Sequence, residues 1–362
     1  MKKGNRGSAK AENPGKAFVT VGIDIGDRFS RYCMVNAAGE VMEEGRMATT
    51  PAALERHFRG ENRQRIAMEC GTHSPWISRL LRRLGHEVWV ANARKLRAIT
   101  ASESKNDRND AEKLARFAAY NPQLLSPIQH RSPERQRDLN LLQARDTLVR
   151  ARTMLVNGLR GLVKSAGYRL PKCSSEAFAR VAGKAIPAGY ETAAKPLIEQ
   201  VAQLSEHIQE MDQQIESLAE RYPEVQKLRS VPGVGPIVAS AYVLTLDSAT
   251  AAENSRAVGA FLGLRPRQSQ SGDSDPQQRI SKTGNDYLRR LLVQAAHYVL
   301  GPFGPDSQLR RWGLKLAASG GKRGKKRAVV AVARKLAVLL HHLWRSGERY
   351  RPFPHAPSGV AV

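Results

Sequence analysis

The sequence contains little cysteine: three residues, Cys33, Cys70 and Cys173, in a chain of 362. Their odd number and wide spacing exclude a disulfide framework and a CxxC metal pair. No run of eighteen apolar residues occurs, so no membrane span is expected. Residues 1–17 are basic and are not followed by an apolar h-region, so we expect a disordered arm rather than a signal peptide. These absences predict a protein of the reducing cytoplasm.

Acidic residues are also scarce relative to basic ones. The chain has 58 Lys and Arg against 33 Asp and Glu, a formal net charge of +25. Such an excess predicts a polyanionic partner, bound through phosphate contacts and counterion release. The basic residues are spread along the chain rather than along one amphipathic helix, which favours nucleic acid over a membrane surface. The composition does not distinguish DNA from RNA.

The first third of the chain reads as alternating strands and helices. Three strand-like runs occupy residues 18–50, and the segments "RIAMECG" and "HEVWVANA" add two more. Helices are indicated by "TPAALERHFRG", by "SPWISRLLRRLG" and by residues 103–120, the first two with capping residues at their starts. The order β-β-β-α-β-α-β-α predicts a mixed sheet with helices on its faces.

The middle of the chain has the periodicity of long helices. Residues 121–137 are rich in proline and predict a linker. Two heptad seams then follow on either side of an interruption at residues 166–190. They consist of Leu141, Ala144, Leu148, Ala151, Leu155, Gly158 and Leu162, and of Leu197, Val201, Leu204, Ile208, Met211, Ile215 and Leu218. This spacing is typical of coiled-coil helices in a hairpin or a dimerising arm, and equally of two helices in an ordinary bundle.

From Ser230 onward the pattern predicts turns and further helices. The segment "SVPGVGPIVASAYVL" resembles a helix–hairpin–helix element, although "PGVG" is also compatible with a simple interhelical turn. A polar loop is expected from Arg265 to Gly284, followed by a long helix. Eleven Lys or Arg residues and no acid lie between Gln308 and Gly347. We expect "GGKRGKKR" there to be a flexible loop, and a helix from Arg327 to bury Val329, Val332, Leu336, Leu339 and Leu343.

Four carboxylates are placed where they could converge. Asp107 and Asp110 are three positions apart, and so share a helix face, in a first turn where the helix dipole alone would explain them. Asp24 and Glu69 end the first and fourth apolar strands, which are neighbours in a sheet of this order. Clustered carboxylates repel one another unless a divalent cation is present, and oxygen ligands favour Mg²⁺ or Mn²⁺. The pattern predicts metal-assisted phosphodiester cleavage or transfer.

Several motifs extend this pattern to a known family. The segments "GIDIG", "AMECGTHSPWI" and "KNDRNDAEKLA" resemble the N-terminal half of the DEDD transposases of bacterial insertion sequences, which include the bridge-RNA-guided serine recombinases. The segments "VPGVGPIVAS", "AFLGLRPRQSQSG" and "RISKTGNDYLRRLL" resemble the C-terminal transposase domain of that family. The resemblance covers residues 18–350.

The resemblance implies a division of the chain. We expect an α/β RNase H-like (RuvC-like) domain with a mixed sheet at residues 18–125. A coiled-coil or dimerisation region at 126–228 and a mainly α-helical transposase domain at 229–350 would follow, with a flexible tail at 351–362. The family's metal-binding tetrad maps onto Asp24, Glu69, Asp107 and Asp110.

The same resemblance places a serine nucleophile at Ser271, in the "SG" of the polar loop. Ser269 and Ser274 are nearby competitors. The continuation "GDS" departs from the glycine-rich sequence common in relatives. The implied reaction is attack of Ser271 on a DNA phosphodiester to form a covalent phosphoserine link, with Mg²⁺ (or Mn²⁺) as cofactor.

The implied partners are donor and target double-stranded DNA, a structured guide RNA and further copies of the chain, as a homodimer or a tetramer. No membrane partner is expected, and the protein would associate with the nucleoid when bound to DNA. The residues expected to contact nucleic acid are Lys105, Arg108, Arg267, Lys282, Arg289, Lys322, Arg323, Lys325 and Lys326. Two alternatives stay open: a Holliday-junction nuclease that uses water, and a non-catalytic architectural protein.

Overall fold

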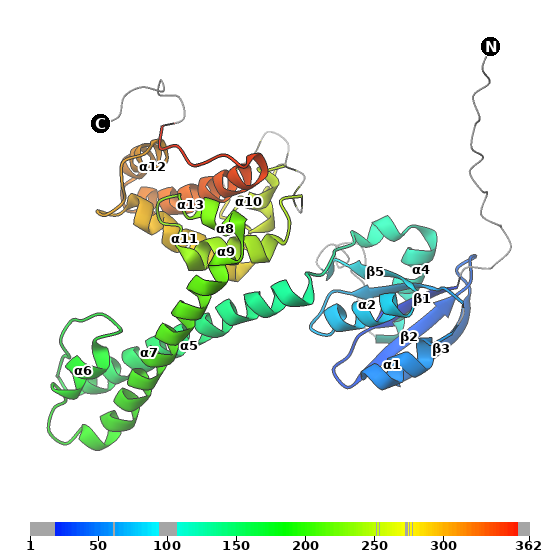
Figure 1. Cartoon of the computed structure of the whole chain (residues 1–362), viewed down its shortest axis with the longest axis horizontal. Coiled ribbons are helices and arrows are strands. Elements are labelled where there is room, and N and C mark those ends of the chain that lie inside the picture. The colour runs from blue at the N-terminus through cyan, green and yellow to red at the C-terminus, as the bar shows by residue number, and fades with distance from the viewer. Residues whose placement is uncertain are drawn as a thin grey trace, which may run out of the picture. The chain divides into compact units, whose positions relative to one another are not determined.

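A computed structural model describes residues 19–60, 62–93, 107–250, 252, 254–271, 274, 276 and 278–353, with the backbone alone for Asp107, Arg108 and Lys322. The predicted arm at residues 1–17, most of the predicted tail and Lys105 lie outside the described residues. The chain forms two compact units, one ending at Arg131 and one beginning at Ser132 (Figure 1). Within the described part, no helix is long and apolar enough to cross a membrane.

The first unit contains the predicted mixed sheet. Its strands are β1 (Thr20–Asp24), β2 (Phe29–Val35), β3 (Val41–Ala48), β4 (Arg65–Glu69) and β5 (Glu87–Ala91), in the order β3-β2-β1-β4-β5. The first three strands are antiparallel, whereas β4 runs parallel to both β1 and β5. Among the described residues, the helices that accompany the sheet are α1 (Pro51–Phe58), α2 (Ser74–Arg83), α4 (Asp107–Tyr120) and the short 3-10 helix η1 (Pro122–Leu125). The predicted order of elements and the adjacency of the first and fourth strands are confirmed.

The alternation of side chains along β1 and β4 gives the sheet two different faces. On one face, the large apolar residues Val21 and Ile23 of β1 and the corresponding Ile66 and Met68 of β4 form a core with α1 and α2. On the other face the residues are small: Gly22 pairs with Ala67. Ala111 and Ala115 of α4 share a buried cluster with β2 on that face, so α4 covers it. The sheet therefore lies between two helical layers.

Helix α4 approaches β1 so closely that only glycine fits at position 22. A Cβ atom at Gly22 would lie 2.0 Å from the Ala111 carbonyl oxygen and 2.5 Å from the Ala115 amide nitrogen. Both are backbone atoms, so they cannot move aside as a side chain can. The close approach fixes the height of α4 above β1, and with it the position of the helix's first turn.

We expect Gly22→Ala to lower the free energy of unfolding by about 2–3 kcal/mol, because the added methyl group forces α4 away from the sheet. Urea unfolding of the two proteins measures the difference. Gly60→Ala is the control, since an added Cβ there meets nothing within 4 Å. Equal losses in the two variants would contradict the close packing of α4.

The second unit is helical. Its elements are α5 (Pro133–Ser165), α6 (Phe178–Gly183), α7 (Glu191–Glu220), α8 (Pro223–Leu228), α9 (Pro236–Leu246), α10 (Ala257–Phe261), α11 (Asp286–Leu300), α12 (Gln308–Ala318) and α13 (Gly321–Ser346). Helix α9 is buried from Ala239 to Leu246 and lies in one core with residues of α11 and α13. The Tyr242 hydroxyl donates to the Ala337 carbonyl at 2.7 Å, which ties α9 to α13.

The two long helices α5 and α7 pair within the chain and run antiparallel. Arg145 bonds Asp212, whereas Arg152, two turns further along α5, bonds Ser205, which lies two turns earlier in α7. The hairpin interpretation is confirmed for this pair, although a coiled coil is not shown. Helix α5 begins at Pro133, inside the predicted linker, because the Ser132 side chain accepts the Arg135 amide and caps it.

The predicted seam is correct for α7 and wrong for α5. Val201, Ile208, Ile215 and Leu218 are buried in α7 as expected. In α5 the buried face instead consists of Leu139, Leu142, Arg152, Val156, Leu159 and Val163, whereas Leu162 is 39 % exposed. Apolar residues occupy two neighbouring faces of α5, so the heptad spacing alone did not decide between them.

The segment expected to be a flexible loop is the start of α13. The helix begins at Gly321, and "GKRGKKR" forms its first two turns. Lysine and arginine favour helices, and a Cβ at Gly324 would lie 2.9 Å from the Ala317 carbonyl oxygen, so glycine there allows α13 to pack against α12. The core stripe of α13 is as predicted at Val329, Val332, Leu336 and Leu343, whereas Leu339 is only half-buried and its neighbour Leu340 is fully buried.

Candidate active site and nucleic-acid interface

Asp24 and Glu69 lie at the same edge of the sheet. They are the last residues of the neighbouring parallel strands β1 and β4, and each follows the paired residues Ile23 and Met68. Because side chains alternate along a strand, Asp24 shares the face of Gly22, and Glu69 shares the face of Ala67. Both carboxylates therefore belong to the face that α4 covers, and both are partly buried.

The direction of α4 brings its first turn to that edge. Near the end of the helix, the Ala118 carbonyl accepts a bond from Arg65 at 3.2 Å, and Arg65 pairs with Thr20 at the start of β1. Further toward its beginning, Ala111 and Ala115 lie over Gly22. The helix thus runs opposite to β1 and β4, so its N-terminus is near the carboxyl ends of both strands.

Asp107 and Asp110 occupy two rows of α4 that face different strands. Position 107 is one turn before Ala111, in the row buried with Cys33 and Val35 of β2. Asp110 is one turn before Leu114, in the row that packs against Ala67 of β4 and Ala91 of β5. The backbone therefore brings the four predicted positions to one end of the sheet. The convergence of their oxygen atoms stays a prediction.

The described side chains alone do not form a metal cluster. No group of three or more His, Cys, Asp or Glu side chains among them is close enough to hold an ion. The distance from Asp110 Oδ1 to Lys113 Nζ is 4.0 Å. Asp24 and Glu69 each interact with another residue. The side chain of Asp107, the fourth predicted ligand, is not among those described. The four-residue tetrad stays a prediction.

The loop after Glu69 is held in place by histidines. Trp76 donates its ring N–H to His73 Nδ1 at 3.1 Å, and His73 Nε2 is 3.3 Å from Asp27 in the loop after β1. The Ser74 hydroxyl lies 3.0 Å from His130 Nε2. The two loops that follow Asp24 and Glu69 are thereby linked, which sequence patterns did not indicate.

Acid is expected to destabilise this unit through His130. Burial, and then the charges of Arg79, Arg82 and Arg131, lower the pKa of His130 to about 4 from its usual 6.5. The unfolded chain takes up a proton below pH 6.5 that the folded protein resists, so stability is full above pH 6.5 and falls until about pH 4. Between pH 7 and pH 5 we expect a loss of about 1 kcal/mol, after allowance for the partly exposed ring.

His130→Gln should lack this part of the pH dependence. Urea unfolding at pH 7 and pH 5 measures it in both proteins. A variant whose stability falls with acid as steeply as that of the wild type would show that other groups are responsible.

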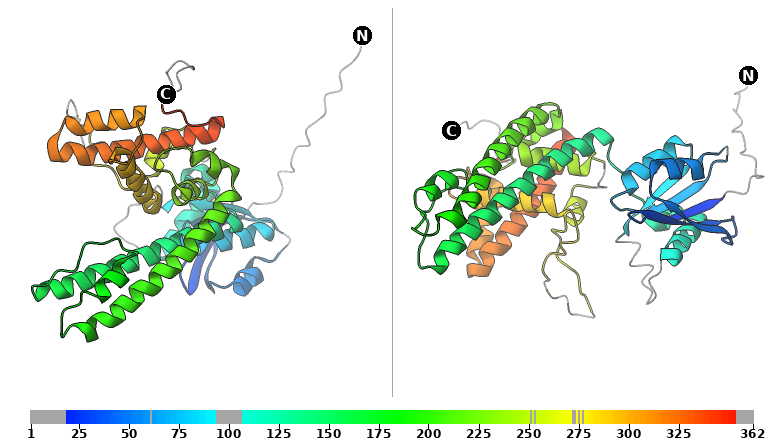
Figure 2. Two further views of the ribbon diagram at one scale, coloured as in Figure 1. Left: turned by 60° about the vertical axis from the view of Figure 1, so that its left-hand side comes forward. Right: turned by 90° about the horizontal axis from the view of Figure 1, so that it is seen from below.

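Ser271 lies in an irregular hairpin of the second unit. Residues 263–271 and 278–282 form two extended segments joined by the bonds Lys282 N–H to Gly263 O, Ser281 N–H to Arg265 O and Arg267 N–H to Arg279 O. Near the tip, Ser271 and Ser274 exchange two backbone bonds of 3.1 Å. In the right-hand view of Figure 2 the yellow segment that follows α10 extends away from the helices. Ser269, Ser271 and Ser274 are all exposed, so accessibility does not choose between them.

The base of the hairpin explains the position of Arg289. A Cβ at Gly284 would lie 2.3 Å from the Phe261 carbonyl oxygen, so the two segments meet tightly there. Arg289 is 8 % exposed, donates to the Leu262 carbonyl at 2.9 Å and pairs with Asp286 at 2.6 Å. The expectation that Arg289 contacts nucleic acid is therefore corrected, because its guanidinium is used inside the unit to hold this base.

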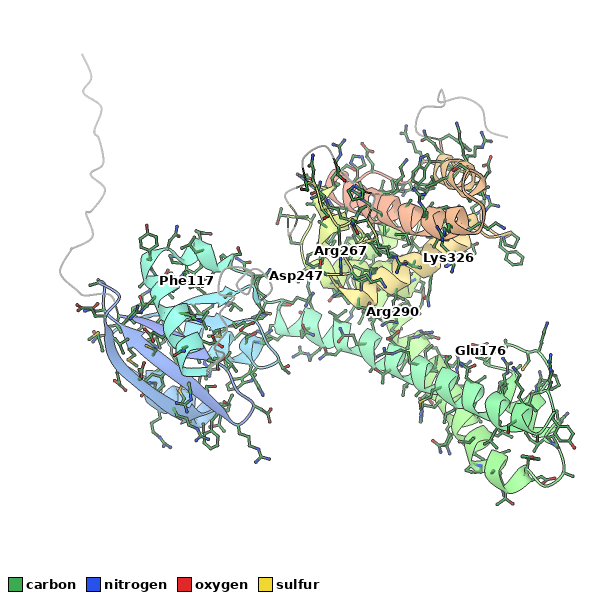
Figure 3. All side chains as sticks on the ribbon, turned by 180° about the vertical axis from the view of Figure 1, so that it is seen from behind. Phe117, Glu176, Asp247, Arg267, Arg290 and Lys326 are labelled. Atoms are coloured by element: carbon green, nitrogen blue, oxygen red, sulfur yellow. The ribbon has the colours of Figure 1, made fainter. Side chains whose placement is uncertain are left out.

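The other predicted contact residues are at the surface wherever their side chains are described. Arg267 and Lys282 are exposed on the hairpin, and Arg323, Lys325 and Lys326 are exposed on the first turns of α13. Figure 3 draws the side chains as sticks and labels Arg267 and Lys326 in this unit. The side chains of Arg108 and Lys322 are not described. Binding of nucleic acid by these residues stays a prediction.

The "VPGVG" segment joins two helices, as expected. It connects α8 to α9, and Gly233 has a φ of +81°, a left-handed conformation that favours glycine. A Cβ at this position would also approach the Ala295 carbonyl of α11 to 2.9 Å. Close packing on α11 thus accounts for this glycine, and contact with phosphate stays a prediction.

Comparisons with known proteins agree with this architecture. Residues 21–167 match a DEDD transposase model for IS110 elements, and residues 225–309 match the model "Transposase IS116/IS110/IS902 family". The chain is 31 % identical to a probable family 20 transposase of Pseudomonas aeruginosa, over 79 % of this chain and 86 % of that protein.

Two further relatives match over nearly their whole lengths. The transposase for insertion sequence element IS1111A of Coxiella burnetii is 27 % identical, over 93 % of this chain and 92 % of its own. A pilin gene-inverting protein of Moraxella bovis is 23 % identical, over 92 % and 97 %. The sheet with its two terminal carboxylates, the α-helical second unit and these matches lead to one conclusion: the chain belongs to the IS110 family of DEDD transposases, enzymes that cleave and rejoin DNA.

Proposed function

We propose that Asp24, Glu69, Asp107 and Asp110 hold a divalent cation that is required for DNA strand cleavage. The observation that carries the proposal is the position of Asp24 and Glu69 on one face of neighbouring parallel strands, at the edge to which the direction of α4 brings its first turn. Two carboxylates so placed repel each other, and a cation removes the repulsion. They would act together with a phosphate group of the DNA.

The donor set fits magnesium or manganese. All four predicted ligands are carboxylates, and oxygen ligands suit Mg²⁺ and Mn²⁺ rather than zinc. When bound, such an ion supplies charge stabilisation to a phosphoryl group and its leaving oxygen. The residues of this chain would position the phosphate: the strand ends hold one side of the site and the first turn of α4 the other.

Ser271 is the proposed nucleophile. Its hydroxyl oxygen would attack a DNA phosphorus atom and form a phosphoserine ester as the bond between phosphorus and the deoxyribose oxygen breaks. The serine would lose its proton to solvent, and the leaving oxygen would take up a proton to become a deoxyribose hydroxyl. Support comes from its exposed place in an extended hairpin, and from the "SG" motif of the family resemblance. The reverse reaction, in which a hydroxyl of another strand attacks the phosphoserine, would complete strand exchange.

The partners follow from charge and resemblance. The net charge of +25 suits a protein that binds both DNA and a structured guide RNA through their backbones. We propose that the RNA selects donor and target DNA by base pairing, and that at least two copies of the chain assemble so that the carboxylates of one copy meet Ser271 of another. The relative from Moraxella bovis is named for inverting a gene, which also supports strand exchange rather than simple hydrolysis.

A covalent-complex assay tests this function. Purified full-length protein, with the RNA that copurifies from cells, is incubated with supercoiled DNA carrying the ends of its element. With Mg²⁺ we expect a protein–DNA complex that survives denaturation and disappears after protease treatment, whereas EDTA should prevent it. Nicked or linear DNA without such a complex would favour the nuclease that uses water. No metal-dependent change in the DNA would favour the architectural protein.

A further inference from the structure

A row of charged residues crosses the sheet beside the proposed metal site. Asp24 of β1 pairs with Arg31 of β2, and Arg31 pairs with Arg46 of β3. Residues directly paired on antiparallel strands point to the same face. Cys33, two residues beyond Arg31, is buried with Ala111 of α4, so the row belongs to the α4 face. Two arginines therefore follow Asp24 across the sheet, on the side away from Glu69.

The two arginines lie opposite each other, whereas Asp24 lies opposite Arg31 alone. Like charges directly opposite on paired strands are destabilising, and both side chains are exposed. Within the described part of the chain, neither guanidinium forms an ion pair with a carboxylate. Arg46 lies over the Phe29 ring, 3.7 Å from its centroid, which holds it on this face. An anion from outside, placed between the two guanidinium groups, would remove the repulsion.

We propose that Arg31 and Arg46 bind the backbone of the DNA strand whose phosphate is presented to Asp24 and Glu69. Neighbouring strands are about 5 Å apart, so each step along the row moves one strand away from the carboxylates. Arginine carries a planar fork of donors that matches phosphate oxygens. The row would bind phosphates next to the one that is cleaved. Phosphate binding by the two arginines does not depend on the proposed function. Only the claim that the bound phosphates lie next to the cleaved one rests on the proposed role of Asp24 and Glu69.

A different explanation is that arginine keeps the edge strand β3 from pairing with other chains, as charged residues on edge strands often do. That explanation requires no ligand, and it predicts that both arginines can be removed without loss of DNA binding. The two readings therefore differ in a measurable quantity.

The test compares two double variants of the full-length protein. Arg31→Ala with Arg46→Ala removes the row, and Arg56→Ala with Arg59→Ala removes the same charge from α1 and its C-cap residue, on the opposite face of the sheet. Binding of a short random-sequence DNA duplex is measured by fluorescence anisotropy in EDTA over a range of salt concentrations. We expect the first variant to bind about tenfold or more weakly at low salt, with a log–log salt slope shallower by about two, and the second to bind almost as the wild type does.

The double variant Arg31→Lys with Arg46→Lys is the control for folding. It keeps both positive charges, so the dependence of DNA affinity on salt concentration should be close to that of the wild type. Equal binding by the row variant and the α1 variant would overturn the proposal. The proposal would also be overturned if the row variant bound an RNA duplex more weakly than the wild type does but bound DNA with unchanged affinity. Because EDTA prevents cleavage, the result does not depend on the metal site: full cleavage by an Asp24→Asn variant would end the carboxylate assignment and leave this result intact.

Discussion

Asp24→Asn is expected to reduce DNA strand cleavage about 10³-fold or more while leaving the fold intact. Asparagine keeps the size of the side chain and removes the negative charge that would hold the cation. A metal ion contributes several kcal/mol of charge stabilisation to phosphoryl transfer, and each 1.4 kcal/mol corresponds to about tenfold in rate. Cleavage of labelled element DNA at saturating Mg²⁺, followed on denaturing gels, measures the loss.

Asp27→Asn is the matched control. Asp27 follows Asp24 by three residues, and its side chain is 90 % exposed and bonded to His73. It carries the same charge near the same edge of the sheet, outside the predicted tetrad. We expect its cleavage rate to stay within a few-fold of the wild type. Asp24→Asn should also bind DNA at least as tightly as the wild type, since a negative charge is removed. Similar rates in the two variants would exclude Asp24 from the chemistry.

Ser271→Ala is expected to abolish the covalent protein–DNA complex. The loss should be about 10³-fold or more, because removing a nucleophile eliminates the covalent pathway. Metal binding and DNA binding should be unchanged, since the side chain is exposed and its backbone forms the hairpin bonds. Covalent complexes are counted on denaturing gels after incubation with element DNA and Mg²⁺.

Two neighbouring serines make this test specific. Ser274→Ala changes the residue that exchanges backbone bonds with Ser271, and Ser269→Ala changes an exposed serine two positions earlier. Both variants should still form the covalent complex. If Ser274→Ala removes it and Ser271→Ala does not, the nucleophile has been assigned to the wrong serine. Strand exchange at the normal rate by all three variants would rule out a serine intermediate.

The order of strands and helices in the first unit could be predicted from the sequence alone. Apolar runs ending in Asp24 and Glu69, with capped helices between them, predicted a mixed sheet in which β1 and β4 are neighbours, as observed. Patterns within long helices were less reliable. In α5, apolar residues on two adjacent faces suggested the wrong seam. The charge run "GGKRGKKR" suggested a loop, whereas all but its first residue form the start of α13, where Gly324 allows close packing on α12.

Other features depend on contacts between distant segments. The burial of Arg289 follows from the Leu262 carbonyl, which no local motif indicates. The row formed by Asp24, Arg31 and Arg46 depends on strand register, and a slip of one residue would place a side chain on the opposite face. Gly22 looks like any strand glycine until α4 is placed above it. Register and helix packing, rather than composition, decide these residues.

Anomalous X-ray scattering from Mn²⁺, in crystals of the full-length protein with element DNA, tests the central claim most directly. The account predicts a manganese peak bounded by Asp24, Glu69 and the first turn of α4, with a DNA phosphate oxygen among its ligands. A well-ordered complex in which manganese binds elsewhere, and in which the four carboxylates point away from one another, would contradict it.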